Sequence, residues 1–370
     1  MSASFLTVVL ERAFNMRDGF GREIDYMRIS VIDSCNLNCY YCNPCDNNEH
    51  CHALNILSVK EVLCIVRAAT RLGIKHFRLT GGEPLLHPQL DEMVLQIKKI
   101  PGVSSVSLTT NAVLLAQHAK WLKEAGIDSI NVSLDTIDAS EYERITKKPL
   151  LHKVEHGIDA AIECGIRVKI NVVLTPQTDV VALTRYVAKK GTDIRFIEMM
   201  PVGEGHTNGV EPYKKVIGTL SKLYGEPCRI NTEKTKEINS GNDKRKIPDN
   251  GPAEYYIFPE LGIRVGLIQA IHGKFCDTCN RIRVTADGRL MPCLGSSVTM
   301  DLVPDSWDFA DDVEKDFAIV RALRAAIKAK PRCHNFNDNA VTYTKTTETK
   351  TTEIEAAEVN AARNMSRIGG

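Results

Sequence analysis

Between Tyr26 and Met200 the sequence alternates short β-rich runs with amphipathic helical runs, and this alternation constrains the fold more than any other feature. Predicted strands begin near Met27, Lys75, Ser104, Asp128, Ile166 and Thr192. Predicted helices end at Gly73, Gly126, Gly165 and Gly191, and a strand follows each of them almost at once. Glycine is common at helix C-termini because it adopts the left-handed conformation without steric cost. A repeated β/α pattern predicts a parallel sheet with right-handed connections.

The predicted fold class is α/β: a partial (β/α)6 TIM-type barrel of parallel strands, closed by a C-terminal extension. The alternation stops after Met200, before the eight strands of a complete barrel are reached, and turn-rich text follows. β-like text returns at 262–271, just before a second group of cysteines. We therefore divide the chain into an N-terminal extension (1–25), a partial barrel (26–200), a C-terminal region (201–335) and a tail (336–370).

Composition excludes several classes of protein. With 370 residues, 43% of them hydrophobic, the chain has enough apolar material for a substantial core. The net charge of +1 gives no reason to expect a nucleic acid partner. No apolar run reaches membrane-spanning length, and the apolar run near the N-terminus lacks the preceding basic segment of a signal peptide. We expect a cytoplasmic protein, whose twelve cysteines are free thiols or ligands rather than a disulfide framework.

Polar residues gather where the predicted strands end. In a β/α barrel the functional groups lie at the C-terminal ends of the strands, so these side chains are predicted to face one cavity. Along the chain they are Cys35, Cys39 and Cys42, then Gly81 to Pro84, Thr110 and Asn111, Ser133 and Asp135, Lys169 and Asn171, and Arg195 and Glu198. Lys169 and Arg195 interrupt apolar strands, where an unpaired buried charge is costly. A ligand-binding role is therefore favoured over a solvated strand-end charge.

Two groups of cysteines have the spacing of metal ligands. Cys35-x3-Cys39-x2-Cys42 does not suit a tetrahedral zinc site, but three thiolates suit a 4Fe–4S cluster with one iron left open to a substrate. The second group is Cys276-x2-Cys279-x13-Cys293, for which structural zinc with His272 as fourth ligand is the commoner interpretation. Arg281 and Arg283 alternate on a predicted strand beside this group. A structural zinc site does not need them, whereas an anionic substrate does.

The first cysteine group resembles the radical S-adenosylmethionine (SAM) enzymes. Their CxxxCxxC loop, with an aromatic residue before the last cysteine, is matched by "CNLNCYYC", where Tyr41 precedes Cys42. Gly81-Gly82-Glu83-Pro84 is similar to the superfamily's GGEP motif, which in the family holds the methionine amino group of SAM. Glycines let a backbone approach a ligand closely, and a carboxylate accepts from an ammonium.

The resemblance extends to one family, the GTP 3′,8-cyclases of molybdenum-cofactor biosynthesis. It is carried by "DGFGREIDYMRISVIDSCNLNCYYC", "FRLTGGEPLL", "LTTN", "INVSLD", "VKINVVL", "IRFIEMMPVG", the second cysteine group with its Arg-x-Arg, and the terminal "MSRIGG". The implied activity is a radical SAM lyase reaction. A 5′-deoxyadenosyl radical from SAM removes the ribose 3′-hydrogen of GTP, and the resulting radical attacks C8, giving 3′,8-cyclo-7,8-dihydro-GTP.

The resemblance also implies roles for single residues. Cys35, Cys39 and Cys42 would hold the first 4Fe–4S cluster, and a second in the C-terminal extension would be held by Cys276, Cys279 and Cys293. The SAM pocket would be lined by Tyr41, Gly82, Glu83, Thr110 and Ser133. Basic positions matched to contacts with GTP or its triphosphate are Arg28, Lys169, Arg195, Arg281 and Arg283. The terminal Gly369 and Gly370 would reach into the active site.

The implied partners are GTP, a flavodoxin- or ferredoxin-like electron donor, and the downstream cyclic pyranopterin monophosphate synthase. A homodimer is also an expectation, which the sequence alone does not decide.

The sequence departs from the family pattern in three places. His76 stands where a lysine for the triphosphate is common, and a histidine is mostly neutral at pH 7, while adjacent Lys75 points to the other side of the strand. Ala112 replaces the glycine of "TTNG", and an inserted loop adds Cys45, His50, Cys51 and His52, a mobile insertion or an extra metal site. These departures leave two alternatives open: a radical SAM enzyme acting on a peptide or other substrate, and a zinc-stabilised binding module.

Overall fold

The computed structural model describes residues 16–42, 55–202, 210–230, 251–296, 299–302, 312–334 and 336. The predicted alternation of strands and helices is present from β1 to β6, and each strand begins within two residues of its predicted start. The strands are β1 (Tyr26–Ser30), β2 (His76–Thr80), β3 (Ser105–Thr110), β4 (Ser129–Ser133), β5 (Val168–Leu174) and β6 (Asp193–Glu198). Between them lie α2 (Val59–Arg71), η1 (Pro84–Leu86), α3 (Leu90–Lys98), α4 (Leu115–Glu124), α5 (Ala139–Thr146), α6 (Leu151–Glu163) and α7 (Val180–Lys189).

The C-terminal region extends this sheet at both edges. β9 (Arg264–Ile268) pairs with β6 and β10 (Arg281–Val284) pairs with β1, both in parallel, so eight strands run in one direction. Antiparallel strands follow on each side: β8 (Glu254–Ile257) and β7 (Cys228–Ile230) beyond β9, and β11 (Arg289–Met291) and β12 (Met300–Asp301) beyond β10. β7 and β12 are the two ends of the strand order. The predicted partial barrel is confirmed, but the predicted closure is not: the C-terminal extension lengthens the sheet at both edges and leaves it open.

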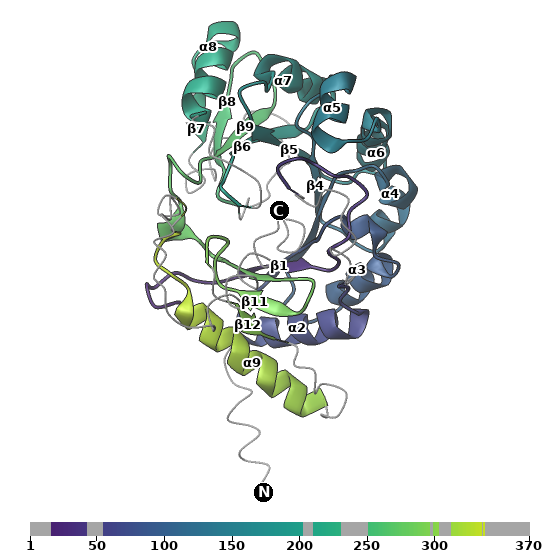
Figure 1. Ribbon diagram of the computed structural model, residues 1–370, viewed down its shortest axis with the longest axis vertical. Coiled ribbons are helices and arrows are strands. Elements are labelled where there is room, and N and C mark those ends of the chain that lie inside the picture. Colours follow the sequence, from purple (N-terminus) through teal and green to yellow (C-terminus); the bar gives the residue numbers. More distant parts are fainter. Residues whose placement is uncertain are drawn as a thin grey trace, which may run out of the picture.

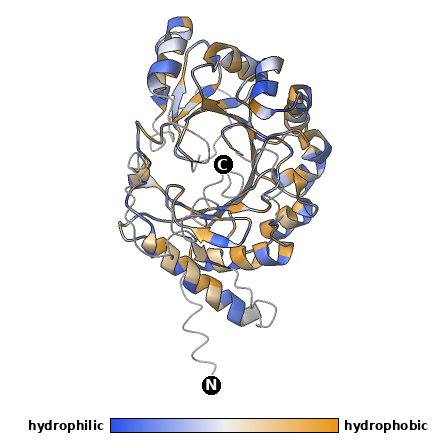
Figure 2. Ribbon diagram, viewed as in Figure 1, coloured by the Kyte–Doolittle hydropathy of each residue, from blue (hydrophilic) through white to orange (hydrophobic). Residues whose placement is uncertain are grey.

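Helices surround the curved sheet on its outer side (Figure 1). The helix α8 (Gly218–Tyr224) follows the short π-helix η2 (Tyr213–Ile217) and packs against α7, while the 3-10 turn η3 (Cys276–Thr278) precedes β10. The long helix α9 (Asp312–Ala329), which was not predicted, packs against α2, and an ion pair joins Arg71 to Asp316 at 2.8 Å. Figure 2 shows hydrophobic and hydrophilic residues mixed along the outer helices, as amphipathic helices require.

The strands have an apolar outer face and a polar inner face. Met27 and Ile29 of β1, and Phe77 and Leu79 of β2, are fully buried in the hydrophobic core that the sheet shares with the helices. The residues between them, such as Arg28 and Arg78, face inward. Because side chains alternate along a strand, this pattern places the core between sheet and helices and leaves the interior of the partial barrel polar.

Helix boundaries follow from local sequence. Ser58 caps α2: its Oγ accepts from the Glu61 amide, and the Glu61 carboxylate accepts from the Ser58 amide in return. The predicted C-terminal glycines Gly73, Gly126 and Gly165 all have positive φ. These caps fix where each strand starts, and so which residues reach its C-terminal end.

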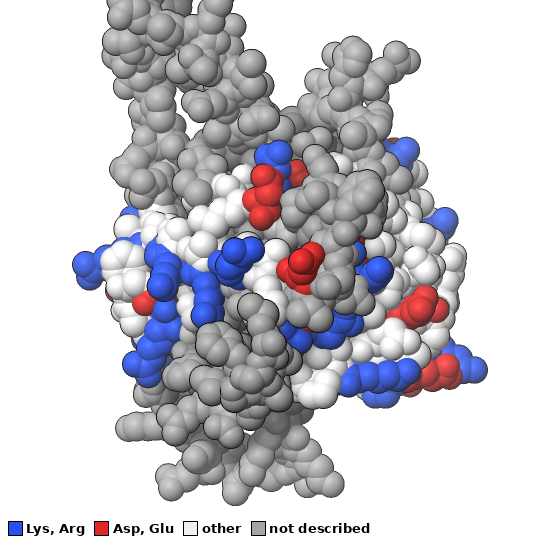
Figure 3. Space-filling view, turned by 90° about the horizontal axis from the view of Figure 1, so that it is seen from below, with Lys and Arg blue, Asp and Glu red and all other residues white. Residues whose placement is uncertain are grey.

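Several predictions lie outside the described residues: Gly369 and Gly370, and the inserted residues Cys45, His50, Cys51 and His52. In the described part of the chain, no helix has both the length and the apolar composition needed to cross a bilayer. Basic and acidic side chains both occur on the face shown in Figure 3, in keeping with the net charge of +1.

Candidate active site

The polar inner faces of the strands enclose one cavity of about 640 Å³. This volume falls in the range of about 300–1,000 Å³ that is typical of small-molecule sites. Every second residue of the parallel strands lines it, among them Tyr26 and Arg28 of β1, His76 and Arg78 of β2, and Lys169 and Asn171 of β5. Both cysteine sets line the same cavity. We call the part around Cys35, Cys39 and Cys42 its first end, and the part around Cys276, Cys279 and Cys293 its second end.

The first cysteine set lies in the loop after β1, at the C-terminal end of the barrel. The loop is fixed by backbone hydrogen bonds from Asn38 to Thr146 and from Tyr40 to Ile145, which attach it to the end of α5. Two N–H groups approach the Cys35 sulfur: the Leu37 amide at 3.5 Å and the Asn111 Nδ2 at 3.7 Å. Such donors suit a sulfur that carries negative charge, as a cluster ligand does.

The thiols of this set stay protonated when nothing is bound to them. Burial, opposed by the Leu37 amide, raises the pKa of Cys35 to about 11, and burial with the like charge of Cys35 raises that of Cys42 to about 12. The pKa of Cys39 is raised well above its usual range by burial and by Cys42. Irons supply the positive charge that turns such thiols into thiolates. Three partly buried, mutually interacting thiols on one cavity therefore fit a cluster.

Gly81 and Gly82 allow two chain segments to pass closely. A Cβ at Gly81 would lie 2.3 Å from the Ile32 carbonyl oxygen, and one at Gly82 would lie 2.2 Å from that of Ser34. The amides of Gly82 and Glu83 in turn donate to Ile32 and Ser34. The glycines thus seat the cysteine loop on the end of β2, a structural role beside the predicted approach to a ligand, and both line the cavity.

Glu83 is fully buried and does not line the cavity. Its carboxylate accepts from the Leu85 amide, the Thr110 hydroxyl at 2.7 Å and the Asn111 amide at 2.7 Å. Burial raises the pKa of Glu83 to about 7 although these donors lower it. The structure thus shows Glu83 joining the ends of β2 and β3, and its direct contact with SAM remains a prediction.

Tyr41 and Ser133 line the cavity beside the first cysteine set. The Tyr41 hydroxyl donates to Asp135, which also accepts from the Val173 amide at 2.8 Å. Burial raises the pKa of Asp135 to about 6, and burial together with the Asp135 charge raises that of Tyr41 well above its usual range. Asp135 therefore fixes the Tyr41 ring at the edge of the cysteine loop.

The second cysteine set lies across the cavity, on η3 and the loop after β11. Cys276, Cys279 and Cys293 all line the cavity. His272, the fourth ligand of the zinc alternative, does not: its Nδ1 is bonded to Glu198, which also accepts from the Ile271 amide at 2.7 Å. In the described residues no three His, Cys, Asp or Glu side chains converge closely enough to hold one metal ion. Three cysteines that line one cavity match the three protein ligands of a four-iron cluster with one open iron.

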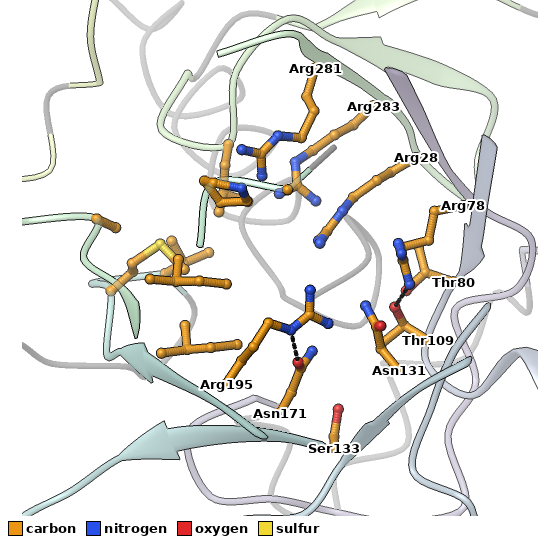
Figure 4. Close-up of a pocket in the computed structure, with 18 of the residues that line it drawn as sticks. Arg28, Arg78, Thr80, Thr109, Asn131, Ser133, Asn171, Arg195, Arg281 and Arg283 are labelled. Carbon is orange, nitrogen blue, oxygen red and sulfur yellow. Dashed lines mark hydrogen bonds between the residues drawn. The ribbon is translucent and has the colours of Figure 1, made fainter. Parts of the chain in front are cut away.

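Arginines dominate the wall between the cysteine sets. Arg28, Arg78, Arg281 and Arg283 point into the cavity from one side, and Arg195 points in from the other (Figure 4). Burial and the like charge of Arg283 lower the pKa of Arg28 well below its usual range. Burial and Arg281 lower that of Arg283 to about 10. Crowded guanidiniums repel one another, and a bound polyanion removes that repulsion.

The remaining polar groups of the wall are oriented by neighbours. Arg195 Nε donates to the Asn171 Oδ1 at 2.9 Å, and the Lys169 ammonium lies 5.9 Å from the centre of the Tyr255 ring. The buried atoms that have no hydrogen-bond partner among the described residues include three on this wall: Arg195 Nη2, Arg281 Nε and Asn131 Oδ1. A polar ligand in the cavity would satisfy them.

Sequence reasoning missed Arg78 and Asn131. Arg78 donates to the Tyr26 hydroxyl and to the Leu108 carbonyl at 3.1 Å, and it lines the cavity. Its signal was present, because Arg78 interrupts the apolar strand "HFRLT" just as Lys169 and Arg195 interrupt theirs. The predicted orientations at this strand are supported: His76 lines the cavity with its Nδ1 2.8 Å from the Ser105 hydroxyl, and Lys75 does not line it.

The structure thus brings the predicted site residues together, apart from Glu83 and the undescribed glycines Gly369 and Gly370. The cavity is lined by Arg28, Cys35, Cys39, Tyr41, Cys42, Gly82, Thr110, Ser133, Lys169, Arg195, Cys276, Cys279, Arg281, Arg283 and Cys293.

Comparison with known proteins defines the class. Residues 29–182 match the family model of the radical SAM superfamily, and residues 192–336 match that of Molybdenum Cofactor Synthesis C. The partial barrel, the cysteine loop after its first strand and these matches define a radical SAM enzyme with a second, C-terminal cysteine site.

The relatives identify the family. The chain is 36% identical over 324 residues to the GTP 3′,8-cyclase of Clostridium perfringens (strain SM101 / Type A), covering 87% of this chain and 95% of that one. It is 35% identical over 331 residues to the GTP 3′,8-cyclase of Petrotoga mobilis, covering 88% and 96%. The chain belongs to the GTP 3′,8-cyclase family. The cofactors of that family are SAM and 4Fe–4S clusters, two of them being typical.

Solved structures support the fold alone. The crystal structure of Streptococcus suis SuiB bound to precursor peptide SuiA has a TM-score of 0.54 at 15% identity, covering 87% of this chain and 69% of that one. The SuiB structure bound to S-adenosylmethionine has a TM-score of 0.52 at 14% identity, covering 75% and 63%.

Proposed function

We propose that this chain is a radical SAM GTP 3′,8-cyclase, which converts GTP to 3′,8-cyclo-7,8-dihydro-GTP in the first step of molybdenum cofactor biosynthesis. The observation that carries the proposal is a single cavity with a cysteine set at each end and a cluster of buried arginines between them. Such a cavity suits a small polyanion held between two cofactor sites, and family membership identifies that polyanion as GTP.

At the first end, Cys35, Cys39 and Cys42 would hold the first cluster, with Gly82, Thr110, Ser133 and Tyr41 around SAM. The Thr110 hydroxyl donates a hydrogen bond to Glu83, so the Thr110 side chain is held in place before any ligand binds. When bound, the cluster and SAM supply a carbon-centred radical. The protein supplies orientation, because β1, β2, β3 and β4 end side by side and place these groups on one edge of the cavity.

At the second end, Cys276, Cys279 and Cys293 would hold the second cluster, whose open iron would bind the guanine. Arg28, Lys169, Arg195, Arg281 and Arg283 would contact the ribose and triphosphate, with Gly369 and Gly370 as further contacts. The Arg195 Nη2 and Arg281 Nε atoms, which lack partners among the described residues, are ready donors for phosphate oxygens.

We also propose the partners and the cellular location of the protein. Reductive cleavage of SAM needs single electrons, so we expect a flavodoxin- or ferredoxin-like donor. The product passes to cyclic pyranopterin monophosphate synthase, the protein works in the cytoplasm, and it forms a homodimer. We also propose the division at residues 200 and 335, although one sheet runs across the first boundary.

The test is anaerobic turnover of reconstituted protein with SAM, dithionite and GTP. We expect 5′-deoxyadenosine and the cyclised nucleotide in equal amounts, from protein carrying roughly eight irons per chain, the content of two four-iron clusters. Deoxyadenosine formed while GTP is left intact would overturn the proposal. Zinc in place of iron would instead support a binding module.

One observation favours a second candidate, a radical SAM enzyme acting on a peptide or other substrate. Burial lowers the pKa of His76, so this side chain adds no positive charge to the cavity near pH 7. His76→Lys restores a cation there. If GTP binding is unaffected by His76→Lys and by loss of the arginines alike, this second candidate gains support.

A further inference from the structure

A further buried cation lines the cavity beside the second cysteine set, next to the arginine wall. Residues 330–334 follow α9 and cross this cysteine set, and we call them the strap. Lys330 begins the strap and is 2% exposed. Its ammonium donates to the carbonyl oxygen of Arg281 at 2.7 Å and to that of Pro292 at 2.8 Å.

These two carbonyls belong to different cysteine segments. Arg281 lies two residues after Cys279, and Pro292 directly precedes Cys293. One ammonium therefore connects segments that are separated by β10 and β11 in the chain. A lysine side chain costs up to about 2 kcal/mol of rotamer entropy when it is fixed, so a buried lysine bound to two backbone oxygens indicates a position that the fold specifies.

The third cysteine segment is attached to the same strap. The His334 amide donates to the Cys276 sulfur. The Arg22 guanidinium donates to the Cys276 carbonyl at 2.6 Å, to that of Pro331 at 2.6 Å and to that of Arg332 at 2.9 Å. Asp18 balances the Arg22 charge through a buried ion pair. The strap therefore contacts all three cysteine segments, and Lys330 is its charged contact inside the cavity wall.

The fixed ammonium also has an electrostatic consequence. Lys330 lines the same cavity as Cys279 and Cys293, and its ammonium is held by the carbonyl oxygens of Arg281 and Pro292, which lie two residues and one residue from these cysteines. A positive charge fixed beside the cysteine segments favours any negative charge that the second site gains.

We propose that Lys330 is the positioning and tuning residue of the second cluster, holding the Cys279 and Cys293 segments together and stabilising the extra electron of the reduced cluster. The inference rests on the proposed function, in that the second cysteine set binds a four-iron cluster. No bond forms or breaks: the flavodoxin- or ferredoxin-like donor proposed above would supply one electron to the bound cluster, and the nearby ammonium would favour the more negative state.

The experiment uses the full chain with Cys35, Cys39 and Cys42 replaced by alanine, so that all cluster signal comes from the second set. Lys330→Met removes the charge and the donors, and Lys330→Arg keeps the charge. The exposed Lys328→Met, two residues away at the end of α9, is the matched control. Iron per chain and the midpoint potential from an anaerobic redox titration monitored by EPR are measured for each.

We expect about four irons per chain and one shared potential in the parent and in Lys328→Met. Lys330→Met should shift the potential to a more negative value or lose the cluster, and Lys330→Arg should stay close to the parent. A Lys330→Met protein with parental iron and potential overturns the inference, and so does a Lys330→Arg protein as impaired as Lys330→Met. If the parent itself binds no iron, the proposed function fails. If the parent binds iron but one of these two outcomes is found for the Lys330 variants, this inference fails and the proposed function stands.

Discussion

Two tyrosines, one toward each end of the cavity, report opposite electrostatic environments. Tyr41 donates to Asp135, and burial with that negative charge raises its pKa well above the usual range. Tyr26 accepts from Arg78, and although burial raises its pKa, the surrounding arginines, Arg78 first, lower it to about 8. The same side chain is thus held as a phenol at one end and brought near ionisation at the other.

The difference matches the ligands that each end is proposed to bind. SAM carries a sulfonium and an ammonium, and the first end offers Asp135 and, behind it, Glu83. GTP carries a triphosphate, and the second end offers Arg28, Arg281 and Arg283. At the second end, burial and the like charges of the arginines make positive charge costly, and a bound triphosphate offsets that cost. At the first end, burial makes negative charge on Asp135 and Glu83 costly, and a cationic ligand offsets that cost. Electrostatics therefore helps to determine which ligand binds at which end of the cavity.

The largest expected effect separates the two cysteine sets. Cys39→Ser should leave about four irons per chain, all in the second set, and abolish 5′-deoxyadenosine formation. Cys279→Ser should also leave about four irons, but SAM cleavage should persist while GTP cyclisation is lost. Iron analysis and product analysis of each variant check this.

The control is Cys45→Ser, in the inserted loop outside the described residues, which should behave as the unmodified protein. Equal losses in Cys45→Ser and Cys39→Ser would show that the three ligands of the first set have been wrongly chosen.

A smaller effect is expected from a single arginine. Arg283→Leu should weaken GTP binding roughly 100-fold, because loss of one buried charged contact costs about 2–5 kcal/mol. SAM binding should change by less than about threefold, since Arg283 lies at the opposite end. Calorimetric titration of both ligands checks the comparison, and Arg289→Leu, outside the cavity and paired with Asp287, is the matched control. Equal weakening of SAM and GTP would contradict the two-ended arrangement.

Tyr26 gives a pH-dependent test of the second end. Its folded pKa of about 8 lies below the unfolded value of about 10. The phenolate is therefore favoured in the folded state, so this contribution to stability is fully present above pH 10 and is lost as the pH falls through 8. This difference of about two pKa units corresponds to about 3 kcal/mol in the free energy of unfolding.

Urea unfolding of the wild type and of Tyr26→Phe between pH 7.5 and 10 should show that the difference in stability between the two proteins changes in favour of the wild type as the pH rises. Absorbance at 295 nm should show one tyrosine titrating near 8, and added GTP should raise that pKa by neutralising the arginines. If no tyrosine titrates before the rest, the second end is less positive than the structure indicates.

The sequence predicted the fold well where local rules decide it. The six strands from β1 to β6 followed from glycine-terminated helices, and the cysteine sets followed from spacing. Alternation within strands also indicates which residues line the cavity: in "HFRLT" and "SINVS" it places Arg78 and Asn131 inward, beside apolar residues that face outward. These two residues were missed because a single polar residue in a short strand has many explanations.

Other features depend on pairing between distant segments. That β10 lies beside β1, and β9 beside β6, is set by hydrogen bonds across about 70 to 255 residues, for which no local pattern exists. The helix α9 was missed although its sequence is helix-compatible. Glu83 shows the same limit in the site. Its motif fixes its place in the chain, but two of the three donors that hold its carboxylate, Thr110 and Asn111, come from the end of β3.

The smallest expected effect concerns the backbone of the first end. Ala112 is fully buried with φ 63°, in the left-handed region, directly after the Asn111 that contacts Cys35. Ala112→Gly relieves about 1–2 kcal/mol of strain, but it loses about 0.8 kcal/mol of methyl burial and adds about 0.4–1 kcal/mol of unfolded-state entropy. These terms nearly cancel, so thermal unfolding should change by no more than about 1 °C. The control, Ala161→Gly in the buried face of α6, has no strain to relieve and should be destabilised by about 2 kcal/mol. If Ala112→Gly is as destabilising as the control, the turn after β3 is not strained, and the first end is held by side-chain contacts alone.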